Sequence, residues 1–364
     1  MNRTLESDVH LKRLAGLRGE IERRELDALL ITNPENVKYL SGFTGTNGTL
    51  IVDADQATLL TDFRYVEQAA EQAPAVAVLD GRSEPRKALV GRLGSASRVG
   101  FDDADMRVKS FRQLEEELEE DRELVAASGA VESLREIKDP QEIDAIARAA
   151  LIGDTIYAAL AESGLAGRKE TEVARQIEQV ALEHGASGLS FPPIVASGPR
   201  GALPHAEPQD VVIERGTLVV LDLGVKYGGY CSDCTRTFAT GSIPDSWREV
   251  YDFVLESQLA ALAAVEPGAE CSRLDAIARE VIEGGGHGDR FGHALGHGVG
   301  IEVHEGPVLA SRSKETLAAG NVITVEPGIY VPGEFGVRIE DLVAVTEDGS
   351  RVLTPFDKRL TTVD

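Results

Sequence analysis

Acidic residues set into apolar, strand-like segments constrain this chain more than any other feature. The apolar run from Leu218 to Leu223 contains Asp222, and a turn at 226–229 leads into a second extended segment that contains Asp233. Aspartate has a poor propensity for strands, and burying its charge is costly. A tight turn centred on Tyr227-Gly228 predicts that the two aspartates lie directly opposite each other, with Cβ atoms about 5 Å apart. A register shift of two residues would keep them on one face, whereas a shift of one would separate them.

The same pattern recurs near the end of the chain. Glu326 lies in an apolar run, and Glu340 lies in the segment that returns after a turn, so that the two are symmetric about Gly333. Four of the seven histidines lie between these two pairs, in residues 287–304. Carboxylates that share one face repel each other strongly unless a cation lies between them. Each acidic residue alone is better explained by an edge-strand or capping role, but four in two matched hairpins favour a metal site.

The residue types narrow the choice of metal. Two Asp, two Glu and one His form an oxygen-rich set with a single imidazole, which suits Mn²⁺, Co²⁺ or Zn²⁺. Bridging carboxylates suit a pair of ions. A structural zinc site would use Cys and His instead, and the three cysteines do not complete one, because Cys231-x-x-Cys234 has no second pair.

Charge and hydropathy exclude several classes of partner. The chain has 37 basic and 61 acidic residues and a formal net charge of −24, which disfavours nucleic acid and anionic membranes. No apolar stretch approaches the length of a membrane span or of a signal-peptide core. We therefore expect a cytoplasmic protein with reduced cysteines and with neither nucleic acid nor membrane as a partner.

A length of 364 residues is comfortable for two domains. Hydrophobic periodicity predicts a helix over 9–25, and two short apolar runs joined by a turn predict a hairpin over 49–60. A new helix is expected at Asp139-Pro140, because proline suits the first turn of a helix. We place the boundary before this helix, with domains at 1–131 and 132–364. The second domain reads as helices, strands, helices and strands again, which indicates the α+β class.

Five segments of the second domain together resemble a known family. They are Leu221-Asp222-Leu223-Gly224, Ser232-Asp233-Cys234-Thr235-Arg236-Thr237, the run from Gly296 to Glu305, Thr324-Val325-Glu326-Pro327-Gly328-Ile329-Tyr330 and Val337-Arg338-Ile339-Glu340-Asp341. In this order they resemble the proline-specific pita-bread metallopeptidases, which are the Xaa-Pro aminopeptidases and the Xaa-Pro dipeptidases (prolidases). The resemblance implies a C-terminal pita-bread (creatinase/aminopeptidase) catalytic domain, preceded by a smaller α/β creatinase-like N-terminal domain. It also implies a homodimer and a peptide substrate with proline in the second position.

The resemblance further implies two divalent metal ions, with Mn²⁺ expected first and Co²⁺ or Zn²⁺ as alternatives. The implied ligands are Asp222, Asp233, His297, Glu326 and Glu340. Asp233 and Glu340 would bridge the two ions.

The other residues implied in catalysis are His205, His293, His304 and Arg338. The histidines correspond to groups that contact substrate or assist proton transfer, and Arg338 would support the carboxylates. Glu326 or a neighbouring histidine would carry a proton to the proline nitrogen, and the sequence leaves that choice open. His287 has no counterpart and is expected in a surface loop, while Tyr230 and Tyr330 are expected to be packing residues.

The first domain bears on the choice between activities. Tyr39 to Gly48, followed by Thr61-Asp62-Phe63-Arg64-Tyr65, looks like the aminopeptidase P type of N-terminal domain. A plainer interpretation is that Asp62 and Arg64 pair with each other inside the domain. We therefore expect a hydrolase of the Xaa-Pro aminopeptidase type, with Xaa-Pro dipeptidase as the alternative.

Three more distant alternatives rank lower. Methionine aminopeptidase usually lacks such a first domain. A non-catalytic pita-bread binding protein, or a metal-free enzyme such as creatinase, is disfavoured because every implied ligand position keeps a residue that can bind metal.

Overall fold

The computed structural model describes residues 3–82, 84–118 and 121–363. The chain divides into two compact units, Met1–Arg135 and Glu136–Asp364. The boundary expected at 131/132 lies at the start of the short helix α6 (Glu132–Arg135), which belongs to the first unit. Among the described residues, no helix combines the length and the apolar character that crossing a bilayer requires.

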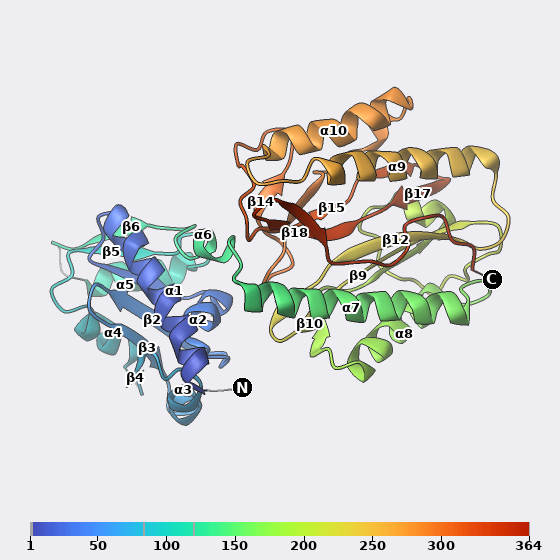
Figure 1. Cartoon of the computed structure of the whole chain (residues 1–364). Helices are drawn as coiled ribbons and strands as arrows, with labels where there is room; N and C mark the ends of the chain where they lie inside the picture. Colours follow the sequence, from blue (N-terminus) through green and yellow to red (C-terminus); the bar gives the residue numbers. More distant parts are fainter. Residues whose placement is uncertain (1–2, 83, 119–120, 364) are drawn as a thin grey trace. The chain divides into compact units, whose positions relative to one another are not determined.

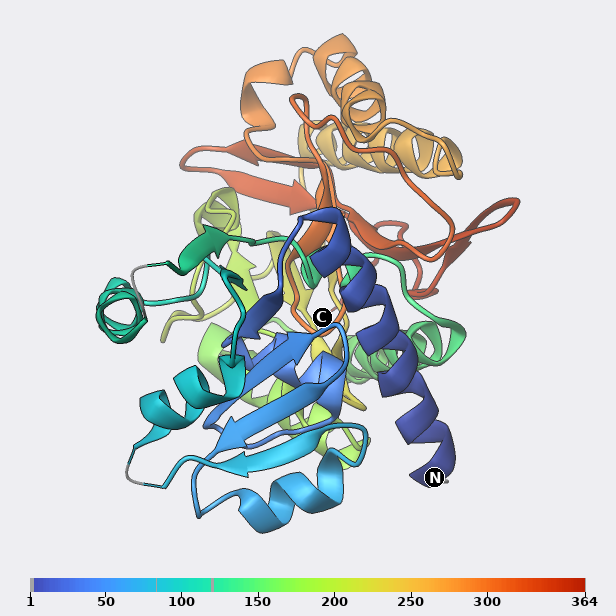
Figure 2. The ribbon, with the colours of Figure 1, turned by 90° about the vertical axis from the view of Figure 1, so that its left-hand side faces the viewer.

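The first unit is a six-stranded sheet with helices on both faces. Its elements are α1 (Arg3–Arg23), β1 (Ala28–Ile31), α2 (Pro34–Ser41), β2 (Gly48–Asp53), β3 (Ala57–Thr61), α3 (Val66–Gln72), β4 (Ala77–Asp80), α4 (Pro85–Leu93), β5 (Arg98–Phe101), α5 (Val108–Glu117), β6 (Glu123–Ala126) and α6. The strand order is β4-β3-β2-β1-β5-β6. Successive residues of a strand face opposite sides, so Ala28 and Leu30 of β1 pack with the side chains of α4 and α5, while α1 lies across the other face (Figures 1 and 2).

Local predictions for the first unit and for the start of the second are confirmed. The expected helix over 9–25 lies largely in α1, and the expected hairpin is the antiparallel pair of β2 and β3, in which Val52 is opposite Ala57. Helix α7 (Pro140–Ser163) begins where Asp139 predicts it. The Asp139 side chain accepts the N–H groups of Gln141 and Glu142, and the Glu142 side chain accepts the N–H of Asp139, which completes a capping box.

The second unit has the predicted order of helices, strands, helices and strands. Its elements are α7, α8 (Glu170–Glu183), β7 (Gly188–Leu189), β8 (Ile194–Ser197), the 3-10 helix η1 (Gly198–Ala202), β9 (Leu218–Leu223), β10 (Val225–Tyr227), β11 (Tyr230–Cys231), β12 (Cys234–Ala239), α9 (Asp245–Ala263), α10 (Cys271–Gly284), the 3-10 helix η2 (Gly288–Arg290), β13 (Gly296–Gly298), β14 (Glu305–Leu309), β15 (Val322–Val325), β16 (Gly328–Val331), β17 (Phe335–Arg338), β18 (Asp341–Thr346) and β19 (Gly349–Val352). In Figure 1 the strands of this unit lie between α7 and α8 on one side and α9 and α10 on the other.

Two hydrophobic cores lie beneath these helix pairs. In β9, Val219, Leu221 and Leu223 pack against α7 and α8. In β15, Ile323 and Val325 pack against α9 and α10. Strand alternation therefore turns the intervening residues, including Asp222, away from the helices and toward the space between the two layers of strands. The fold thus gives one face of each strand to the core and leaves the other for polar groups.

Candidate metal centre

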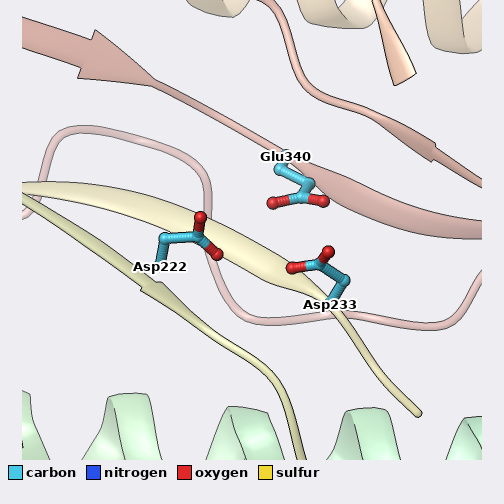
Figure 3. Close-up of side chains that lie close together, drawn as sticks. All are labelled: Asp222, Asp233 and Glu340. Carbon is cyan, nitrogen blue, oxygen red and sulfur yellow. The ribbon is translucent and has the colours of Figure 1, made fainter. Parts of the chain in front are cut away.

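Three carboxylates, from Asp222, Asp233 and Glu340, point toward one another between the strand layers (Figure 3). Each offers an oxygen atom that lies within 4.8 Å of the others, and all three residues are at least nine-tenths buried. Burial, and repulsion between the acidic groups of the site, raise the pKa of Asp233 and of Glu340 well above their usual values. Asp222 Oδ1, Asp233 Oδ1 and Glu340 Oε1 are buried without a hydrogen-bond partner. Unpaired buried oxygens that converge in this way fit a bound cation.

The first hairpin does not have the predicted register. The turn falls at Gly228-Gly229, where both residues have positive φ, and not at Tyr227-Gly228. Asp222 is therefore opposite Thr235, two residues beyond Asp233. The prediction of direct opposition is wrong because a two-residue turn of this kind favours residues that adopt positive φ, and the adjacent glycines supply both. The shift is one of two residues, so Asp233 stays on the face of Asp222, as alternation requires.

The second pair has the predicted symmetry about Gly333. Val325 is opposite Asp341, and Gly328 is opposite Arg338. Glu326 and Glu340 lie between these two ladders at equivalent register positions. Because alternation places both side chains on one face, the second pair faces the first across the interior.

His297, in β13, links the two acidic pairs. Its Nε2 lies 3.3 Å from Glu326 Oε1 and 3.7 Å from Asp233 Oδ2. Its Nδ1 lies 3.0 Å from the Gly298 carbonyl oxygen, so Nδ1 carries a hydrogen and Nε2 faces the carboxylates. Although burial opposes the charge on each group, the hydrogen bond between them raises the pKa of His297 and lowers that of Glu326. The structure thus brings together all five residues of the implied ligand set, and their role as ligands stays a prediction.

The buried guanidinium of Arg338 supports two of the carboxylates. Its Nη2 lies 2.6 Å from Asp222 Oδ2, and its Nε donates to Thr235 Oγ1 at 3.0 Å. Thr235 in turn donates to Glu340 Oε2 at 2.7 Å. A single guanidinium cannot balance four ionised carboxylates, which is why the pKa values of Asp233 and Glu340 are raised, and divalent cations would stabilise the ionised forms instead.

Tyr330, which the sequence indicates as a packing residue, belongs to the polar network. Arg338 Nη1 donates to its hydroxyl at 2.9 Å, and the hydroxyl lies 2.9 Å from His293 Nε2. The Nδ1 of His293 lies 2.8 Å from the Ala294 carbonyl oxygen, so both nitrogens of this ring are engaged. The sequence could have indicated this role, because Tyr330 lies four residues after Glu326 and strand alternation places both side chains on one face.

His304 lies against His297, and His205 lies near enough to His304 for its charge to act on it. The rings of His304 and His297 meet edge to face with centroids 4.4 Å apart. Burial, followed by the charge of His297 and more weakly that of His205, lowers the pKa of His304. Within the part of the chain that the structure describes, neither the His304 ring nor the His205 ring makes a hydrogen bond. The His205 side chain is exposed.

Comparison with known proteins identifies the family. The profile of "Metallopeptidase family M24" matches residues 144–347, and that of "Creatinase/Prolidase N-terminal domain" matches residues 13–137. The chain belongs to metallopeptidase family M24. The predicted fold is confirmed: this M24 protein has an α+β architecture, with a pita-bread catalytic domain preceded by a creatinase-like N-terminal domain.

Relatives of this M24 protein match it over nearly their whole length. An Xaa-Pro dipeptidase from Pyrococcus furiosus is 39% identical, over 96% of this chain and 99% of the relative. Among solved structures, the Xaa-Pro dipeptidase from Bacillus anthracis is 38% identical with a TM-score of 0.95, covering 97% of this chain and 100% of that one. The X-Pro aminopeptidase from Thermotoga maritima MSB8 is 36% identical with a TM-score of 0.86, covering 94% and 99% respectively.

Other residues singled out in the sequence lie outside the candidate metal centre of this M24 protein. His287 is half-buried against Phe253, with ring centroids 6.0 Å apart. Cys234 packs in the core beneath α7 and α8, on the face away from the carboxylates, as alternation predicts. In the first unit, Arg64 donates twice to Asp62, at 2.7 and 2.9 Å, which confirms that the two residues pair.

Proposed function

We propose that this M24 protein is a metal-dependent Xaa-Pro dipeptidase, which hydrolyses dipeptides whose second residue is proline. The observation that carries the proposal is full-length similarity to proteins named Xaa-Pro dipeptidase, at 39% identity in sequence and at a TM-score of 0.95 in structure. The sequence alone favours the aminopeptidase, and these comparisons support the dipeptidase alternative better. Residues 132–364 would form the catalytic domain and residues 1–131 the creatinase-like domain.

The metal ions in this proposal are two divalent cations, with Mn²⁺ as the first candidate. Asp222, Asp233, His297, Glu326 and Glu340 would hold them, with Asp233 and Glu340 shared between the ions. The three unpaired buried oxygens support this assignment. When bound, such ions would supply an activated water and polarise the scissile carbonyl.

The remaining groups suit different tasks. Despite burial, the hydrogen bond from His297 lowers the pKa of Glu326, so this carboxylate is ionised. That is the state that a proton acceptor or a metal ligand requires, although the lower pKa makes it a weaker base. The lowered pKa of His304 keeps its imidazole neutral, and its uncommitted ring nitrogens are available to a peptide carbonyl. Because both nitrogens of His293 are engaged, we assign that residue to positioning Tyr330 and Arg338.

The second candidate function is Xaa-Pro aminopeptidase. The Thermotoga maritima structure named X-Pro aminopeptidase, at 36% identity, favours it. The peptide substrate is common to both functions. The homodimer and the cytoplasmic location stay predictions.

Hydrolysis of a matched pair of peptides, an Xaa-Pro dipeptide and the corresponding Xaa-Pro-Yaa tripeptide, tests the proposal. We expect Mn²⁺-dependent cleavage that is confined to the dipeptide and is abolished by a chelator. Faster release of the first residue from the tripeptide would make the protein an aminopeptidase. Asp233→Ala, which removes an implied bridging ligand, serves as the inactive control, and full activity of this variant would contradict the ligand assignment.

A further inference from the structure

The segment from Ser197 to Gln209 contacts Arg338, which binds one of the site's carboxylates. It contains η1 and His205, and the Pro204 carbonyl oxygen accepts a hydrogen bond from Arg338 Nη1 at 3.2 Å. The placement of this segment therefore decides where His205 lies relative to the implied metal ligands.

One fully buried carboxylate, that of Glu170, holds both ends of the segment. Glu170 lies in the first turn of α8. Its Oε1 accepts the N–H and the hydroxyl of Ser197, both at 2.9 Å. Its Oε2 accepts hydrogen bonds from Nε–H of Arg200 at 2.9 Å and from the main-chain N–H of Gln209 at 3.0 Å. The first and last residues of the segment are thus joined through a single side chain.

All four partners of Glu170 are hydrogen-bond donors, so the position requires a group that only accepts. An ionised carboxylate has acceptor sites for all four. A glutamine of the same shape would direct its NH₂ group at Arg200 and Gln209 or, if turned over, at Ser197. Either orientation places a buried donor against a donor, which forfeits the bond and leaves polar groups unsatisfied.

The middle of the segment is seated by contact with β17. A Cβ atom on Gly336 would lie 1.8 Å from the Gly201 carbonyl oxygen, so the two backbones approach as closely as glycine permits. Strand β17 continues to Arg338, which binds Asp222. The segment therefore rests on Glu170 at its ends and on a strand of the metal centre in its middle, while His205 is left exposed.

We propose that Glu170 is a positioning residue for peptide binding: it holds the 197–209 segment so that His205 meets the substrate. The inference rests on the proposed function. The four hydrogen bonds that the Glu170 carboxylate accepts all come from this segment, so its effect should reach the substrate through the segment and leave metal binding intact.

Glu170→Gln tests this role through steady-state kinetics with an Xaa-Pro dipeptide and Mn²⁺. We expect KM to rise about tenfold while kcat changes by less than about threefold, which is the pattern for lost substrate positioning. Hydrogen exchange should show faster exchange of the amides in 198–209. The Mn²⁺ dissociation constant should remain that of the wild type.

Two further variants make the test specific. Glu172→Gln is the matched control, because Glu172 lies in the same turn of α8 and accepts the N–H of Lys169, so its KM should be unchanged. In a His205→Ala background, Glu170→Gln should add less than about twofold to KM, because the two residues act through one contact. If Glu170→Gln fails to fold, Arg200→Met removes one donor from the same carboxylate and should give a smaller rise in KM.

The outcomes separate the two proposals. Wild-type exchange in 198–209 of Glu170→Gln, or a full additional tenfold effect on KM in the His205→Ala background, overturns the positioning role. A wild-type enzyme that cleaves no Xaa-Pro peptide overturns the proposed function instead, and the exchange measurement still decides whether Glu170 holds the segment.

Discussion

Replacement of Thr235 by valine isolates the hydrogen bond that supports the Glu340 carboxylate. Thr235 Oγ1 donates to Glu340 Oε2 at 2.7 Å and accepts from Arg338 Nε at 3.0 Å, and the residue is fully buried. Valine has nearly the same shape, so the change removes the hydroxyl with little loss of packing. It leaves a buried carboxylate and a buried guanidinium each without one partner.

The expected loss follows from the charge on Glu340. A hydrogen bond to a charged group contributes about 1.5–3 kcal/mol. If that energy is lost only when Glu340 binds a cation as a carboxylate, the dissociation constant for Mn²⁺ should rise about 10- to 150-fold. Replacements of residues that support metal ligands cost about 10- to 100-fold in affinity in other proteins, which agrees with this range.

Isothermal titration of the metal-free protein with Mn²⁺ measures the effect directly. Thr237→Val is the matched control, because Thr237 lies on the same face of β12 and its hydroxyl bonds the main chain of Arg338 at 2.9 and 3.1 Å. The control should lose stability but keep an Mn²⁺ affinity within about threefold of the wild type. An unchanged affinity in a folded Thr235→Val protein would refute the argument that this hydroxyl supports a metal ligand.

Three further predictions concern stability and substrate binding. Arg236→Met should lower the free energy of unfolding by about 1.5–3 kcal/mol, because it removes a charge-assisted hydrogen bond to the buried Asp341 while Lys358 still pairs with that carboxylate, and a loss below about 1 kcal/mol in urea unfolding would contradict this. Gly336→Ala should raise KM, because its Cβ would meet the Gly201 carbonyl oxygen at 1.8 Å, and a wild-type KM would contradict the seating of η1. Burial raises the pKa of Asp154 from 3.8 to about 6, so the stability contributed by its proton is present below about pH 4 and is lost as the pH rises through 6. Asp154→Asn should therefore have a free energy of unfolding about 1 kcal/mol higher than the wild type at about pH 8, after allowance for solvent screening. At about pH 4 it should show no gain. Thermal unfolding at both pH values measures the difference.

The faces of the strands were predictable because alternation is a property of the backbone. Asp222 is flanked by Leu221 and Leu223, and these two leucines pack beneath α7 and α8 in the structure. The positions of these leucines therefore predict that Asp222 faces away from the core. The exact pairing did not follow, since adjacent residues at Tyr227, Gly228 and Gly229 offer more than one turn, and only the folded hairpin selects between them.

Residues with two plausible roles were the ones that sequence reasoning misread or passed over. Tyr330 has a large apolar ring, so the sequence indicates packing, and its hydroxyl partners come from elements far away in the chain. Glu170 looks like an ordinary acidic residue in the first turn of a helix, where the helix dipole favours a negative charge. Its four donors come from residues 197–209, and no local pattern in the sequence announces such a long-range arrangement.

The alternation of core-facing and site-facing residues along each strand restricts where insertions and deletions can occur. In β9, core leucines alternate with Asp222. A single inserted or deleted residue would therefore turn leucines toward the acidic centre and an aspartate into the hydrophobic core beneath the helices. The same change would disable the chemistry and unfold the protein together. Insertions and deletions in related proteins should therefore occur in turns such as 332–334. The neighbouring strands should keep their length even where their residues are substituted.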